Sequence, residues 1–150
     1  MAEQLNNQLW EKCESGRVEE ARQALAAGTD PNARGGLFNG TCLMVAATFD
    51  HDRVVELLLS TPGIQVNAKS KGGMTALHIA CRSGSLASLA LILSSPGVQL
   101  NERDNEGCTP IMRAIESCQT EAVLEMAAVP QVCLDVRDSQ GRSLEEIANM

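Results

Sequence analysis

Six cysteines and two histidines are the residues of this chain best suited to chemistry, as metal ligands, redox groups or nucleophiles. No two cysteines are separated by only two residues, so the Cys-x-x-Cys spacing typical of zinc sites and redox pairs is absent. We therefore expect no metal site, and reduced thiols in a cytoplasmic or nuclear protein. The cysteines are Cys13, Cys42, Cys81, Cys108, Cys118 and Cys133.

Other sites of chemistry find equally little support. His78 and Cys81 would share one face of a helix, where two ligands can meet a metal ion, but a packed thiol is the interpretation that we favour for Cys81. The sequence supports no arrangement of Ser, His and Asp for nucleophilic catalysis. Neither glycine pair, at 35–36 or 72–73, belongs to a phosphate-loop motif. The sequence predicts that the chain is not an enzyme and needs no cofactor.

Composition excludes further classes of protein. A length of 150 residues suits one domain, and a hydrophobic fraction of 44% is enough for a core. The net charge of −7 disfavours a nucleic-acid binder, which needs a basic surface. No apolar run approaches the roughly 20 residues that span a bilayer, and the first ten residues do not form a secretory signal. Because Trp10, Phe38 and Phe49 are the only aromatic residues, the core must be aliphatic.

The elements that would position any site follow from an internal repeat. Four independent columns of residues recur with a period of 34, which is a strong sign of a repeat architecture. The columns are Thr41, Thr75, Thr109 and Ser143; Ala46, Ala80, Ala114 and Ala148; Gly73, Gly107 and Gly141; and Asn67, Asn101 and Asp135.

Each repeat predicts the same local structure. The hydroxyl residue opens an apolar run and can cap a helix, as in the third copy, where Leu77, Ala80 and Cys81 lie on one helical face. A second apolar run follows a short break and ends at a Pro-Gly pair, at 62–63 and 96–97. Short strands, at 65–67 and 99–101, then lead into a turn closed by glycine. The fourth copy lacks this Gly at 129–131, so we expect a strained or differently shaped turn there.

The segment from Thr75 to Ala80, Thr-Ala-Leu-His-Ile-Ala, resembles the Thr-Pro-Leu-His-x-Ala signature of the ankyrin repeat, and the segments at Thr41, Thr109 and Ser143 are weaker copies. The resemblance implies an all-α repeat fold, an α-solenoid built from helix-turn-helix units and β-hairpin turns. It implies a single domain with full repeats at about 5–38, 39–72, 73–106 and 107–140 and a partial fifth at 141–150. Because that fifth copy lacks its second helix, we favour a chain cut from a longer protein over a natural cap. We expect a monomer, and a dimer through the apolar end face is the alternative.

Ankyrin proteins bind partners through a concave groove formed by the turn tips and the inner helices. Carried over to this chain, that groove predicts an apolar patch with three flanking cations. In the alternative, Phe38 folds back over its own turn and Phe49 fills the break between helices. The predicted partner-binding residues are Leu37, Phe38, Val45, Phe49, Lys71, Met74, Ile79, Arg82 and Arg113.

Three further features depend on the same alignment. Residues 69–102 carry three cationic side chains and one carboxylate, so a partner with apolar anchors and some acidic character would suit the middle repeats. Cys108 is expected to be an exposed thiol. Four cations are expected to form a ladder along the turns, which is either solvated or in contact with a partner. Three asparagines are expected either to brace the turns or to be hydroxylated. These residues are Arg34, Lys69, Arg103 and Arg137, and Asn32, Asn67 and Asn101.

The sequence thus predicts a non-catalytic protein-protein interaction module that binds a protein partner through its groove, as part of a larger intracellular scaffold or adaptor. Two alternatives stay open. One is a stand-alone inhibitor of an enzyme such as a kinase. The other is an engineered scaffold without a natural ligand.

Overall fold

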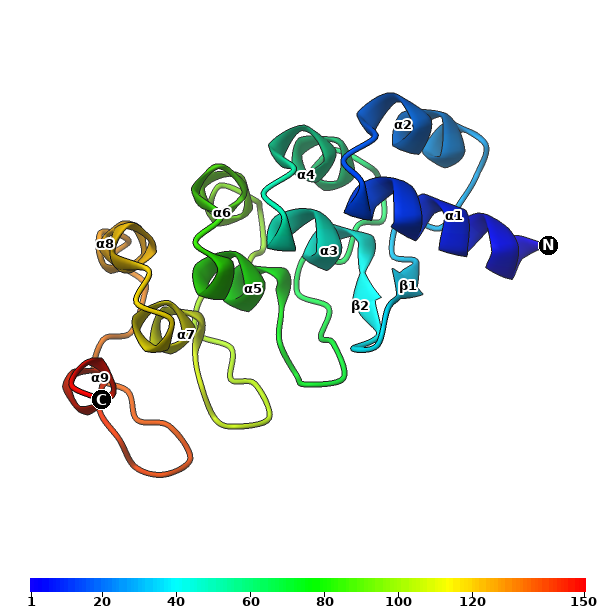
Figure 1. The fold of residues 1–150 in the computed structure, drawn as a ribbon. Helices are drawn as coiled ribbons and strands as arrows, with labels where there is room; N and C mark the ends of the chain where they lie inside the picture. Colours follow the sequence, from blue (N-terminus) through cyan, green and yellow to red (C-terminus); the bar gives the residue numbers. More distant parts are fainter.

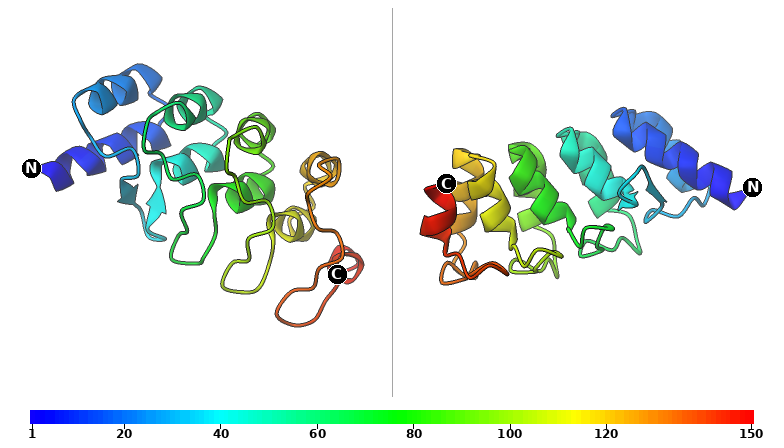
Figure 2. Two further views of the ribbon diagram at one scale, coloured as in Figure 1. Left: turned by 180° about the vertical axis from the view of Figure 1, so that it is seen from behind. Right: turned by 60° about the horizontal axis from the view of Figure 1, so that its bottom comes forward.

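The computed structural model describes residues 1–150, and its helices stack in two rows (Figure 1). Figure 2 shows that the rows stay side by side along the whole stack, while the connecting loops project from the inner row to one side. This is the α-solenoid that the resemblance to ankyrin repeats implies. The inner row is α1 (Ala2–Glu14), α3 (Cys42–Thr48), α5 (Ala76–Ser83), α7 (Pro110–Glu116) and α9 (Leu144–Ala148). The outer row is α2 (Val18–Ala26), α4 (Asp52–Leu59), α6 (Leu86–Leu93) and α8 (Thr120–Ala127).

The inner helices α3, α5, α7 and α9 share one kind of N-terminal cap, in which a side chain accepts a hydrogen bond from the backbone amide of the N-cap residue. In α5 the His78 Nδ1 accepts a hydrogen bond from the Thr75 backbone N–H at 3.1 Å. Met44, Met112 and Glu146 accept from the corresponding amides of α3, α7 and α9. Imidazole, thioether and carboxylate all satisfy an amide that the helix itself leaves without a partner. In these four helices the position therefore needs an acceptor that reaches back one turn rather than a histidine.

His78 also connects two repeats. Because Nδ1 accepts from Thr75, the ring proton lies on Nε2, which donates to the Cys108 carbonyl at 2.9 Å. The side chain is fully buried, and this burial lowers its pKa from the usual value near 6.5. His78 is therefore a neutral structural group of the core.

The outer helices start differently, after a residue in the left-handed region. This position repeats every 34 residues as Gly16, Asp50, Gly84 and Cys118, with φ between 53° and 69°. At Asp50 hydrogen bonds offset the cost of the left-handed backbone. The carboxylate accepts from the Ser88 amide at 2.9 Å and from the Ser88 hydroxyl at 2.8 Å, in the first turn of α6. Cys118 has an exposed side chain and makes no comparable contact.

The loops that leave the outer helices contain less strand than the sequence predicts. Only β1 (Arg34–Gly35) and β2 (Gly40–Thr41) form strands, which pair as an antiparallel hairpin, and a single antiparallel bridge joins Arg137 to Ser143. The strands expected at 65–67 and 99–101 do not form, so that prediction is wrong. The physical reason is that side-chain amides replace a backbone ladder: Asn67 donates to the Gly97 carbonyl and accepts from the Gln99 amide, both at 2.8 Å.

The same asparagine bridge explains the turn at 129–131. Gly63 and Gly97 are left-handed at the two preceding turns, whereas no residue of 129–131 has a positive φ. The turn is therefore differently shaped rather than strained. The Gln131 carbonyl still accepts from the Asn101 amide at 3.0 Å, so the contact between neighbouring repeats is kept.

The core is aliphatic, as the composition requires. One continuous cluster of 26 buried residues runs through the stack, and alanines and leucines of the inner helices contribute much of it. No phenylalanine belongs to it. None of the helices combines the length and the apolar character needed to cross a membrane.

Cys118 supplies a test of the left-handed column. Replacing Cys118 by Gly removes a Cβ from a residue with φ 56°, so the free energy of unfolding should rise by about 1 kcal/mol in a denaturant titration. Gly84→Ala makes the reverse change at the equivalent position of the preceding repeat, and it should lower stability by more than this amount, because its Cβ would also clash with the Gln119 side-chain oxygen. A loss of stability in Cys118→Gly would contradict this explanation.

His78 predicts a pH dependence of stability. Its pKa is lowered in the folded state, so below the unfolded value near 6.5 the unfolded chain binds this proton and the folded chain does not. The stability contributed by neutral His78 is therefore complete above that pH and declines as the pH falls. Urea titrations between pH 7.5 and 5.5 should show this decline in the wild type and a flatter profile in His78→Gln. Equal slopes would contradict the assignment.

Candidate functional site

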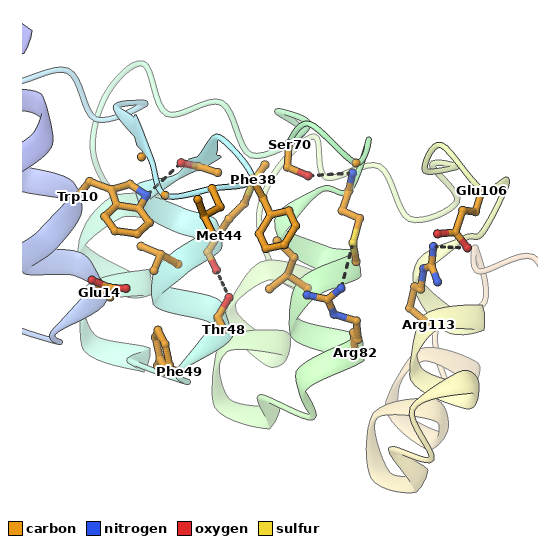
Figure 3. A pocket seen from close by; sticks show the side chains of 18 residues that line it. Trp10, Glu14, Phe38, Met44, Thr48, Phe49, Ser70, Arg82, Glu106 and Arg113 are labelled. Carbon is orange, nitrogen blue, oxygen red and sulfur yellow. Dashed lines mark hydrogen bonds and ion pairs between the residues drawn. The ribbon is translucent and has the colours of Figure 1, made fainter.

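A groove of about 640 Å³ lies along the inner row of helices, between the β1–β2 hairpin and the start of α7 (Figure 3). The structure brings together eight of the nine predicted site residues here, and it leaves out Lys71, which is exposed nearby. The eight are Leu37, Phe38, Val45, Phe49, Met74, Ile79, Arg82 and Arg113.

The apolar residues divide into a floor and a rim. Val45, Met74 and Ile79 are buried and form the floor. Leu37 is 91% exposed, Phe38 73% and Phe49 54%. These fractions contradict the alternative in which the two phenylalanines cover the turn and the helix break. The groove therefore offers a large apolar surface to solvent.

Trp10 builds one wall of the groove, and the sequence analysis did not place it there. Its indole lies flat on the hairpin backbone, so near that a Cβ at Gly35 would come within 2.6 Å of the ring. Its Nε1 donates to the Gly40 carbonyl at 3.0 Å. Trp10 occupies the same repeat position as Met44 and His78, and this column, read together with the glycines at 35–36, was the available signal.

Arg113 ends the groove, but its charge is compensated within the chain. Its guanidinium pairs with Asp104 at 2.7 Å, Glu116 at 2.7 Å and Glu106 at 3.5 Å, and its side chain is only 12% exposed. Burial alone would raise the pKa of Asp104, but hydrogen bonds from Arg113 and from the Cys108 and Glu106 amides more than offset this and lower it.

Arg82 has no such partner. No carboxylate forms an ion pair with its guanidinium, and the only side-chain atom that accepts from it is the Met74 sulfur, at 3.6 Å from Nη1. The side chain is exposed, and it rises from α5 toward the groove in Figure 3. Glu14 likewise lines the opposite end of the groove without forming an ion pair.

The cation ladder has a structural role. Arg34 donates to the Asn39 carbonyl of its own turn and to the Lys69 carbonyl of the next, both at 2.8 Å. Lys69 and Arg103 repeat the bond to the following repeat, at the Arg103 and Arg137 carbonyls. The ladder is thus neither freely solvated nor available in full to a partner, because Arg34, Lys69 and Arg103 hold successive turns together, while Arg137 bonds the Gly141 carbonyl of its own turn.

The prediction of an exposed thiol at Cys108 is wrong. Its side chain is 2% exposed and packs against Met112 and Ile147, and burial raises its pKa to about 11. The residue is held inward because its amide donates to Asp104 and its carbonyl accepts from His78. The exposed thiols are Cys118 and Cys133. No group of three or more His, Cys, Asp or Glu side chains is arranged to hold a metal ion.

Comparison with protein families agrees with this geometry. A family model described as ankyrin repeats (3 copies) matches residues 9–104 and 43–132. The chain belongs to the ankyrin repeat family. Ankyrin repeats are generally protein-protein interaction modules. No curated protein matched the chain.

Asp104 gives a test of the compensated end of the groove. Asp104→Asn leaves Arg113 without one of its two carboxylate contacts at 2.7 Å in a largely buried site, so we expect a loss of about 3 kcal/mol in the free energy of unfolding. Asp135→Asn makes the same chemical change at an exposed residue that forms no ion pair, and it should change stability by less than about 0.5 kcal/mol. Equal effects in a denaturant titration would contradict the structural role of the Asp104 pair.

Proposed function

We propose that this chain is a non-catalytic module that binds a protein partner in the groove lined by Trp10, Phe38 and Arg82. We further propose that it serves a larger scaffold or adaptor in the cytoplasm or nucleus. The observation that carries the proposal is the apolar rim of Leu37, Phe38 and Phe49, directly above a buried apolar floor.

Exposed aromatic and aliphatic side chains are costly to keep in water when they are contiguous, and such patches usually mark an interaction site. Phe38 and Phe49 are the only phenylalanines of the chain, and both lie on this groove rather than in the core. Aromatic residues near the centre of an interface often supply most of its binding energy. The placement of both rings supports a role in binding.

The groove is also built to hold its shape. Trp10 fixes the hairpin that carries Leu37 and Phe38, and the Lys71 amide donates to the Phe38 carbonyl at 2.9 Å, which connects that hairpin to the next loop. A surface that is ordered before binding loses less conformational entropy when the partner arrives. These contacts support a preformed binding surface.

A non-catalytic role fits the state of the groups best suited to chemistry. His78 has both ring nitrogens engaged in the core, and burial raises the pKa of the Cys81 thiol to about 12. Neither residue lines the groove. The groove contains apolar surface and charge but no nucleophile paired with a base.

The double variant Phe38→Ala/Phe49→Ala tests the proposal. Both rings are more than half exposed, so the thermal melting curve should change little, while capture of partner proteins from cell lysate should fall at least tenfold. Leu124→Ala on α8 is the matched control, because Leu124 is 64% exposed and does not line the groove. It should capture the same proteins as the wild type.

Two results would overturn the proposal. Undiminished capture by the double variant would place binding elsewhere. A large fall in melting temperature that occurs in the double variant and not in Leu124→Ala would mean that the two rings stabilise the fold rather than bind a partner.

A further inference from the structure

The two arginines of the groove differ in how their charge is compensated. Arg113 faces three carboxylates at 2.7–3.5 Å, so it has little to offer a ligand. Arg82, one repeat earlier on the neighbouring inner helix, forms no ion pair. A thioether is a weak acceptor, so most of the five N–H donors of Arg82 lack a protein partner. The groove therefore contains one exposed guanidinium whose hydrogen bonds are unmade.

We propose that the groove takes a short segment of its protein partner in which an apolar side chain adjoins an aspartate or glutamate. The apolar side chain packs on Met74 and Ile79 beside Phe38, and the carboxylate pairs with Arg82. This inference rests on the function proposed above and specifies the chemistry of the partner.

The surroundings of Arg82 favour a carboxylate. The Met74 sulfur lies 3.6 Å from the Arg82 Nη1, and Met74 and Ile79 are buried apolar side chains that line the groove together with Phe38. An ion pair beside apolar surface is screened less than one in open solvent. The planar guanidinium can also bind both oxygens of one carboxylate, which adds geometric selectivity.

The other charges of the groove limit what fits. Glu14 stands at the end of the groove beside Trp10 without an ion-pair partner, and Glu106 lies at the far end beside Arg113. A polyanion such as a nucleic acid or an anionic membrane would meet both carboxylates, and the chain as a whole carries −7. A segment with a single carboxylate at Arg82 and a neutral or cationic residue toward Glu14 meets neither repulsion.

Selection from a random peptide library displayed on phage tests this inference, with the full chain as bait. The wild type should enrich sequences in which an aromatic or large aliphatic residue lies within one or two positions of Asp or Glu. Arg82→Glu should instead enrich Lys or Arg at that position. Arg53→Glu makes the same charge change on α4, outside the groove, and should enrich the wild-type sequences.

The affinity of one enriched peptide gives the quantitative test. Trp10 is the only tryptophan and lines the groove, so its fluorescence can follow the titration. Arg82→Glu and the uncharged Arg82→Gln should each weaken binding at least about tenfold, and Arg53→Glu less than about twofold. Thermal melts of all three variants establish that they are folded.

The outcomes separate this inference from the proposed function. Enriched peptides without an acidic preference, or peptides that bind Arg82→Gln as well as the wild type, overturn the inference and leave the groove as the binding site. Peptides that bind Phe38→Ala/Phe49→Ala undiminished contradict the proposed function as well. If no peptide is enriched, the inference that the groove binds a short acidic segment is overturned. The capture experiment with Phe38→Ala/Phe49→Ala then tests the proposed function independently.

Discussion

No helix pair of this chain can bury its own apolar face, and every other feature follows from that constraint. Stacking neighbouring pairs buries one continuous aliphatic core, and bonds at a constant period hold the stack in register. His78 reaches the Cys108 carbonyl, Asn67 reaches Gly97, and Arg34 reaches Lys69, each in the following repeat. These contacts involve backbone groups of the loops, so they hold the backbone of the stack in place. The side chains on the inner face of the stack can therefore differ from repeat to repeat.

The variation on that face is what distinguishes this ankyrin chain. On the inner helix α7 Arg113 is enclosed by three carboxylates, whereas on the preceding inner helix α5 Arg82 has only a sulfur contact. The hairpin at 34–41 is held by Trp10 and carries Leu37 and Phe38 into solvent. One end of the groove is thus closed by internal ion pairs, and the rest of it presents apolar surface beside Arg82, the lining cation that forms no ion pair.

The sequence predicted what depends on local periodicity and missed what depends on contacts between repeats. The hydroxyl column located the inner helices, and the exposed rings of Phe38 and Phe49 lie on the groove where the ankyrin alignment puts them. Cys108 was misplaced because Asp104 and His78, which both belong to the preceding repeat, turn it inward. Trp10 was missed because its place in the wall depends on two glycines about 25 residues later in the chain.

Site-specific photo-cross-linking tests the central claim, that partners bind this groove, most directly. A benzophenone amino acid would replace Phe38 in one variant and Leu124 in another, because both side chains are well exposed and only Phe38 lines the groove. After incubation with cell lysate and irradiation, we predict covalent adducts with a protein partner at position 38 and none at position 124. Equal adducts at both positions, or adducts at position 124 alone, would contradict the account.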